Sequence, residues 1–348
     1  MPSILKKKQF WGGLIACGIL VFLFYDLDLP LTIALARRLR LWYLVPALVC
    51  TTLLTVFKTL RWKTIISRVR KVVFWPTLCL YSTSQIIGIL LPALTGQAGR
   101  IILFSRKGEF TKTYAFSTIF LEVVLDGAGL IILMLLSSSV FVFPKEYRFI
   151  SYIIGGATLM VLGLFYASLH FQGAMERFGY NIIRRRSVRA FLVMRKFLRS
   201  FNEGISVLRS TDQLFVVSSY TFLSWAMHIG AVYFLFAMFH FQLPLWAAVV
   251  VIIINYLALM VPITPGNVGS FQLAVVAGLN IFSIAKTEAV LFSVILYIVD
   301  MLPTSLLAAC FLMKEQFSIS EISQDERLIA EVEQMVVESD PTIGDDKK

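Results

Sequence analysis

Three charged residues lie within or beside long apolar stretches, where a charge is costly and is therefore a candidate for function. Glu122 and Asp126 are four residues apart in the apolar stretch 114–143, so they share one face of the expected helix. Each carboxylate at membrane depth costs at least about 2.5 kcal/mol, so the pair requires a cation, a proton or water. Arg100 is the expected partner, because a guanidinium holds a carboxylate or a phosphate through two parallel hydrogen bonds. The carboxylates form either a buried ion-pair network or part of an anion site, and for Arg100 we favour a substrate role.

A fourth charge, Asp300, lies in the last apolar stretch, 288–313, and is followed by Pro303. It is either a residue at a helix kink, which the nearby proline favours, or a further substrate contact. We keep it among the candidate binding residues.

Two segments share a spacing of amide side chains, proline and glycine. The motif occurs twice with every matched pair 170 residues apart, as Gln85-x6-Pro92-x3-Gly96-Gln97-x-Gly99 and as Asn255-x6-Pro262-x3-Gly266-Asn267-x-Gly269. Proline and glycine both interrupt helices, and an interruption at membrane depth survives only inside protein or beside a water-filled cavity. The repeat therefore predicts two broken helices around an interior cavity. The alternative is that these residues merely kink closely packed spans.

The composition of the chain predicts the elements that hold these residues. Of 348 residues, 58% are hydrophobic and only 15% charged, and the mean hydropathy is +0.79. Soluble domains carry about 25% charged residues. Because apolar runs long enough to cross a bilayer recur along the chain, we predict an all-α polytopic membrane protein. Coiled coils, disordered chains and disulfide-rich scaffolds are excluded.

The distribution of lysine and arginine predicts the topology. If every apolar stretch crossed the membrane, the basic loop 170–212 would lie outside, against the positive-inside tendency. Re-entrant hairpins at 72–107 and 246–284 instead place 22 basic residues inside and 6 outside. The expected crossings are then 10–25, 41–57, 114–143, 149–169, 213–239 and 288–313. The two hairpins enter from opposite faces, which makes an inverted repeat typical of alternating-access transporters.

This topology divides the chain into a transmembrane domain, 1–313, and an acidic cytoplasmic tail, 314–348. Within the domain, repeat one covers about 41–143, a basic amphipathic linker covers 172–212, and repeat two covers about 213–313. Both termini are expected in the cytoplasm, and the protein in the inner cell membrane.

The basic linker contains an expected amphipathic helix. Its apolar face consists of Ala190, Phe191, Met194, Phe197, Leu198 and Phe201, and its basic face of Arg189, Arg195, Lys196 and Arg199. Such a helix either lies on the membrane surface and attracts anionic headgroups or serves only to set the topology. Membrane lipids are therefore the expected partners, and nucleic acid is not. The cysteines and histidines show no metal-ligand spacing, so we expect no metal and no cofactor.

Two runs resemble the signatures of the lysylphosphatidylglycerol synthase transmembrane family, also called the flippase-like family. They are PALTGQAGRIILFSRKGEFTKTYAFSTIFLEVVLD from Pro92 to Asp126 and VPITPGNVGSFQLAVVAGLNIF at 261–282. The resemblance implies two opposed re-entrant hairpins in a lipid-translocating domain. Members with an added soluble domain aminoacylate phosphatidylglycerol, and this chain resembles the stand-alone membrane part. It departs from the family at Gln97 and Gln272, where members carry glutamate, and at Val123, where arginine is common.

The sequence therefore predicts a lipid flippase without covalent chemistry. Its substrate would be an anionic phospholipid or a polyprenyl-phosphate-linked lipid, moved between leaflets by alternating access. The candidate binding residues are Gly96, Gln97, Gly99, Arg100, Glu122, Asp126, Gly266, Asn267, Gly269, Gln272 and Asp300. The alternatives are a membrane-embedded lipid transferase and an accessory subunit of a synthase. Assembly of several copies of the chain is left open.

Overall fold

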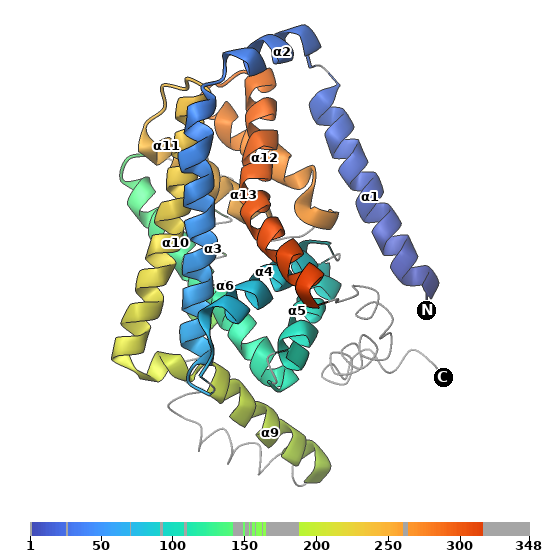
Figure 1. Ribbon diagram of the computed structural model, residues 1–348, viewed down its shortest axis with the longest axis vertical. Coiled ribbons are helices and arrows are strands. Elements are labelled where there is room, and N and C mark those ends of the chain that lie inside the picture. Colours follow the sequence, from blue (N-terminus) through green and yellow to red (C-terminus); the bar gives the residue numbers. More distant parts are fainter. Residues whose placement is uncertain are drawn as a thin grey trace.

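The structure, a computed structural model, consists of helices throughout its described elements (Figure 1). It describes residues 2–25, 27–69, 71–90, 93–107, 110–141, 188–259 and 264–315, together with scattered residues between 149 and 164. The α-helices are α1 (Pro2–Phe24), α2 (Leu29–Arg38), α3 (Leu44–Ile66), α4 (Phe74–Leu90), α5 (Ala93–Lys107), α6 (Lys112–Ser138), α9 (Val188–Gly204), α10 (Thr211–Met238), α11 (Leu245–Leu259), α12 (Ser270–Asn280) and α13 (Lys286–Glu315).

Within the described part of the chain, four helical stretches are long and apolar enough to cross a bilayer. They are Leu41–Ile66, Lys112–Ser138, Thr211–Met238 and Lys286–Cys310, and each exceeds the roughly 20 residues that span about 30 Å of hydrocarbon. Shorter apolar helices are Gly13–Phe24 and Leu245–Leu259. The prediction of an all-α polytopic membrane protein is confirmed. Of the expected crossings, most of 149–169 falls outside the described residues.

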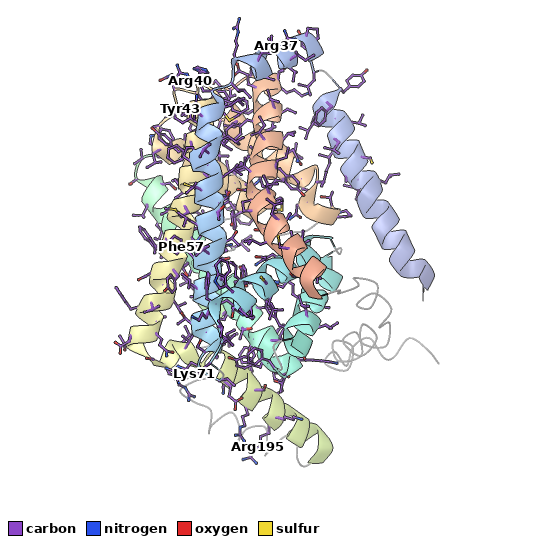
Figure 2. All side chains as sticks on the ribbon, in the orientation of Figure 1. Arg37, Arg40, Tyr43, Phe57, Lys71 and Arg195 are labelled. Atoms are coloured by element: carbon purple, nitrogen blue, oxygen red, sulfur yellow. The ribbon has the colours of Figure 1, made fainter. Side chains whose placement is uncertain are left out.

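The long helices run between two ends that carry basic side chains. Arg37 and Arg40 lie at one end of the molecule, Lys71 and Arg195 lie at the other, and Phe57 lies between them (Figure 2). α3 packs along α10, and the largest apolar core lies around α10, α11, α12 and α13. α9 lies at the same end as Arg195, whereas the start of α1 and the end of α13 lie nearer the middle of the molecule (Figures 1 and 2).

The first interruption separates α4 from α5 after Leu90. The two helices pack against each other in the half of the molecule nearer α9 (Figure 1). A Cβ on Gly88 would lie 2.9 Å from Cδ of Arg100, so this glycine makes room for the arginine stem. Pro92 lies outside the described residues.

The second interruption separates α11 from α12 and lies in the opposite half of the molecule (Figure 1). A short 3-10 turn, η4 (Pro265–Asn267), precedes α12. Gly266, Asn267 and Gly269 have φ values of 66°, 55° and 85°, a region in which glycine is favoured. The expectation that glycines permit unusual backbone here is confirmed, whereas Pro262 lies outside the described residues. The 3-10 turn η4 contacts α4, so the two interrupted regions touch.

The helix expected at 41–57 is longer than predicted. α3 continues to Ile66, so Lys58 and Arg61 lie inside a helix and not in a cytoplasmic loop. The hydroxyls of Thr51, Thr55 and Thr59 each donate to the carbonyl four residues earlier. These bonds satisfy the hydroxyls internally, and the four-residue spacing places a polar stripe on the buried side of the helix.

Candidate functional site

Glu122 is the centre of a buried polar network. Its Oε2 accepts from Nη2 of Arg100 at 2.9 Å, and its Oε1 accepts from Nε2 of Gln85 at 3.2 Å. The hydroxyl of Tyr81 also donates to Oε1. The expected pairing of Arg100 with a carboxylate of α6 is therefore present. Because α4 supplies Tyr81 and Gln85 and α5 supplies Arg100, both helices of the first interruption position this carboxylate.

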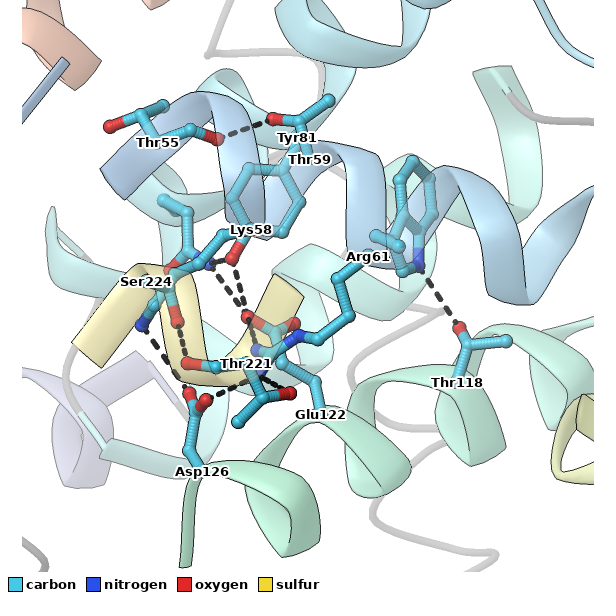
Figure 3. A network of polar contacts seen from close by, with 12 residues as sticks. Thr55, Lys58, Thr59, Arg61, Tyr81, Thr118, Glu122, Asp126, Thr221 and Ser224 are labelled. Carbon is cyan, nitrogen blue, oxygen red and sulfur yellow. Dashed lines mark hydrogen bonds and ion pairs between the residues drawn. The ribbon is translucent and has the colours of Figure 1, made fainter. Parts of the chain in front are cut away.

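Asp126, one helical turn further along α6, binds two cations of α3. Its Oδ1 accepts from Nη1 of Arg61 at 2.6 Å, and its Oδ2 accepts from Nζ of Lys58 at 3.3 Å (Figure 3). Nη1 of Arg61 also donates to Oγ1 of Thr221 on α10 at 3.2 Å, and its Nη2 lies 3.7 Å from Oε1 of Glu122. Arg61 therefore joins the two carboxylates into one network.

The network has a deeply buried interior and a more accessible edge. The side chains of Arg61, Arg100 and Glu122 are 1%, 6% and 6% exposed, whereas those of Lys58 and Asp126 are 19% exposed. Among the described residues, the network joins three cationic side chains, Lys58, Arg61 and Arg100, to two carboxylates. Arginine binds carboxylate and phosphate with the same geometry, so the cluster is chemically suited to bind an anion that exchanges with a carboxylate.

Sequence reasoning missed Lys58, Arg61, Tyr81 and Thr221. The sequence places Lys58 and Arg61 in a loop, because the apolar stretch 41–57 ends just before Lys58. The threonines at 51, 55 and 59 were the available signal, because their spacing continues one helical face past that point.

Asp300 does not join the Glu122 network. Its Oδ2 lies 3.2 Å from Nε2 of His228 on α10, and the His228 ring meets the edge of Tyr256. Four residues beyond Asp300, the hydroxyl of Thr304 lies 3.1 Å from that of Thr55 on α3. Asp300 thus belongs to a second polar pair between α10 and α13.

The candidate residues of the second interruption mainly satisfy its backbone. Oε1 of Gln272 accepts from the amide of Gly269 at 2.7 Å, which caps the start of α12. The carbonyl of Gly266 accepts from the hydroxyl of Tyr297 at 2.7 Å. The side chain of Asn255 donates to the carbonyl of Phe271 at 3.3 Å. These contacts stabilise irregular backbone in an apolar environment.

The remaining candidate binding residues lie in α5 and η4. Gly96 and Gly99 lie within α5, and Gly99 is buried. Asn267 is half-buried in η4. The side chain of Gln97 lies outside the described side chains.

The basic linker contains α9, as expected, and a surface pocket beside it. Phe201 of α9 packs near Phe116 of α6, with ring centroids 6.5 Å apart. The pocket has a volume of about 490 Å³. It is lined by Arg68, Val69, Arg199, Asn202, Glu203, Ser206 and Arg209. The amphipathic helix therefore contributes basic side chains to the end of the bundle.

Spanning helices with a buried ionic network beside a helix break define a polytopic α-helical membrane protein with an intramembrane polar site. The chain matches the model of one family, described as the lysylphosphatidylglycerol synthase TM region, over residues 9–308. It belongs to that family, as the sequence motifs predicted. No curated protein and no solved structure gives a match to the chain.

Proposed function

We propose that this protein moves an anionic lipid between the leaflets of the membrane. The observation that carries the proposal is the cluster of three cations, Lys58, Arg61 and Arg100, around the carboxylates of Glu122 and Asp126 at the first helix break. A lipid phosphate is the natural counter-charge, because an arginine fork binds carboxylate and phosphate with the same geometry.

The edge of the network suggests how the lipid enters. A phosphate first meets Lys58 and Asp126, the most accessible members, and competes with Asp126 for the ammonium group. It then exchanges with Glu122 for Arg100, so that each cation keeps an anionic partner throughout. This exchange avoids the cost of a bare buried charge, which is the main barrier to moving a headgroup through hydrocarbon.

The two helix breaks give the proposal a route between leaflets. α4 and α5 occupy one half of the molecule and α11 and α12 the other, an arrangement that supports an inverted repeat. In this scheme the halves rock about the α4 and η4 contact and expose the site to each leaflet in turn. Both termini then lie in the cytoplasm, with α9 on the inner leaflet.

The contacts of the carboxylates favour transport over lipid transferase chemistry. Glu122 accepts from Arg100, Tyr81 and Gln85, and Asp126 accepts from Arg61 and Lys58. A general base needs a carboxylate oxygen that is available to a proton of its substrate, and the oxygens of both carboxylates already accept from these donors.

A flip assay in proteoliposomes tests the proposal. Purified protein is reconstituted with a fluorescent phosphatidylglycerol, and the fraction reached by an external quencher is followed in time. We expect Arg100→Ala to slow translocation at least about tenfold, because one lost charge-assisted hydrogen bond is worth roughly 1.5–3 kcal/mol. Arg100→Lys keeps the charge without the fork and should be intermediate.

Arg37→Ala is the matched control, because Arg37 is an exposed arginine at the other end of the molecule. It should translocate lipid like the wild type. Translocation by Arg100→Ala at the wild-type rate would overturn the proposal. So would conversion of labelled lipid into a new product by the purified protein, which is the transferase outcome.

A further inference from the structure

A second polar pair joins two helices that are long and apolar enough to cross the membrane, α10 and α13. Nε2 of His228 lies 3.2 Å from Oδ2 of Asp300, and each side chain is 9% exposed. A lone carboxylate in such a place is strongly unfavourable. The pair is therefore most stable when it holds the one proton that makes its net charge zero.

The pair also has two polar atoms without a partner. Among the described residues, Nδ1 of His228 and Oδ1 of Asp300 are buried and make no hydrogen bond. An ion pair that served only to hold two helices together would be expected to have these atoms satisfied, because each unmet one costs free energy. Unmet buried atoms are typical of sites that bind something other than protein. Histidine is the side chain that ordinarily changes its charge between pH 5 and 8, so a proton is the ligand that fits this pair.

Other ionisable groups surround the pair without neutralising it. On the neighbouring helices α3, α4, α6 and α11, the ionisable side chains between the helix ends are Cys50, Lys58, Arg61, Cys79, Tyr81, Glu122, Asp126 and Tyr256, and α12 has none. The ring of Tyr256 meets that of His228, with centroids 5.7 Å apart. Tyr256 also interacts electrostatically with Asp300 and with Lys58. Within the described part of the chain, Asp300 forms its ion pair with His228 and with no lysine or arginine.

Two contacts connect the pair to the Glu122 network. His228 lies seven residues after Thr221 on α10, roughly 10 Å along the helix at about 1.5 Å per residue, and Thr221 accepts from Arg61. On the other side, the hydroxyl of Thr304 on α13 lies 3.1 Å from that of Thr55 on α3. Because α3 carries two of the three cations of the network, the charge of the pair acts on those cations at short range.

The protonation state of the pair therefore changes the affinity of the network for an anion. With its proton the pair is neutral, and without it the pair carries one negative charge. At roughly 10 Å and an effective dielectric constant of about 20, that charge weakens the binding of an anion about tenfold. Coupling between two binding sites is reciprocal, so a bound anion favours the protonated pair by the same factor.

We infer that His228 and Asp300 form a proton-binding site that couples transport to a proton gradient. This inference rests on the proposed function and specifies its coupling ion. The imidazole takes a proton from water on the side where the anionic substrate binds and returns it to water on the side where the substrate leaves. One anion and one proton cross together, so no net charge moves and a proton gradient can drive the lipid.

The pH dependence of lipid binding tests the site. The affinity of the detergent-solubilised full-length protein for an acyl-labelled fluorescent phosphatidylglycerol is measured by anisotropy at about pH 6 and about pH 8, where the lipid phosphate stays a monoanion. The wild type should bind about tenfold more tightly at the lower pH. Asp300→Asn removes the negative charge, and a buried imidazole without its carboxylate stays neutral. This variant should therefore bind equally at both pH values.

Asp212→Asn is the matched control, because Asp212 is an exposed aspartate in the first turn of α10. It should keep the pH dependence of the wild type, since water and salt screen an exposed charge. Thermal unfolding identifies any variant that has lost its fold. The comparison of the two pH values in the wild type tests the site without any variant.

A pH gradient across proteoliposomes tests the coupling. The flip assay is run with the same lipid at equal pH and with a difference of about one pH unit, and the final distribution between leaflets is measured. With one proton per lipid, this gradient should enrich the lipid up to about tenfold in the leaflet that faces the more alkaline side. The distribution should stay even for Asp300→Asn, and for the wild type under an equal sodium gradient at constant pH.

Wild-type affinity that is the same at both pH values overturns the inference, as does Asp300→Asn that keeps the wild-type response. A sodium gradient that shifts the lipid where a pH gradient does not also overturns it. Translocation that ignores the pH gradient removes the coupling but leaves transport standing. Binding whose pH dependence requires Asp300, in a protein that moves no lipid, removes transport but leaves the proton site standing.

Discussion

The two helix interruptions share a sequence spacing but differ in backbone. In the first, α4 ends at Leu90 and α5 resumes at Ala93, so the matched glycines Gly96 and Gly99 lie within a helix. In the second, the matched Gly266 and Gly269 adopt positive φ, and α12 begins only at Ser270. Equal spacing of proline and glycine therefore does not impose one conformation.

A local difference accounts for this contrast. Pro265 follows the second break, whereas the matched position in the first segment is Thr95. The residue before a proline avoids the helical region, and Thr264 is indeed extended, with φ −117° and ψ 145°. The second segment cannot resume its helix until that proline is passed.

The two regions also differ in how they satisfy polar groups. Side chains around the first break form ion pairs between helices, centred on Glu122. Side chains around the second break bond to their own backbone, as Gln272 does with Gly269. The first break therefore brings charged side chains together, whereas the described side chains at the second break stabilise irregular backbone. Three substitutions test this difference.

The largest effect is expected at Arg61. Arg61→Met leaves Asp126 without its closest cation and should lower the free energy of unfolding by about 3–5 kcal/mol, because a buried charge loses its partner. Titration with SDS in mixed micelles, followed by circular dichroism, measures this. Adding Asp126→Leu to Arg61→Met should recover part of the loss. Arg37→Met is the exposed control, and equal stability of the two single variants would contradict the prediction.

An intermediate effect is expected at Gly269. An alanine there must adopt φ 85° and place its Cβ 3.2 Å from Cβ of Ile19. Strain of this kind costs about 1–3 kcal/mol, so Gly269→Ala should unfold at correspondingly lower SDS. Gly18→Ala is the control, because nothing lies within 4 Å of a Cβ at that glycine on α1. If both alanine variants were equally stable, the second break would not require its glycine.

The smallest effect is expected at Gln272. Gln272→Leu removes the acceptor for the amide of Gly269 and should cost about 1–2 kcal/mol, the usual loss on removing a helix cap. Gln272→Glu keeps an acceptor at the same place and should retain most of the stability. The same titration compares the two variants. A leucine variant as stable as the glutamate variant would show that the cap contributes nothing.

The sequence predicted the main charged contact and both helix interruptions. Arg100 could be paired with a carboxylate of α6 in advance, because the first break brings this arginine to membrane depth beside Glu122. Gly269 and Gln272 were predicted to bind substrate, and Asn255 was recognised as part of the repeat; spacing does not specify whether an amide binds a ligand or, as here, a backbone group.

Other parts of the site depended on tertiary packing. Arg61 sits beyond an apolar stretch, and only its burial against Asp126 and Thr221 distinguishes it from a cytoplasmic arginine. His228 is recognised as part of a polar pair only from its contact with Asp300, which lies 72 residues away along the chain. Such pairings join separate helices, so neither periodicity nor composition can anticipate them.

The close approach of Gly269 to α1 links the N-terminal helix mechanically to the second break. A Cβ on Gly269 would lie 3.2 Å from Cβ of Ile19 and 3.3 Å from the carbonyl oxygen of Ala16, so the glycine allows α1 to approach this closely. Displacement of η4 or the start of α12 must therefore either carry α1 along or separate the two surfaces. A label on α1 would then report movement of the second break.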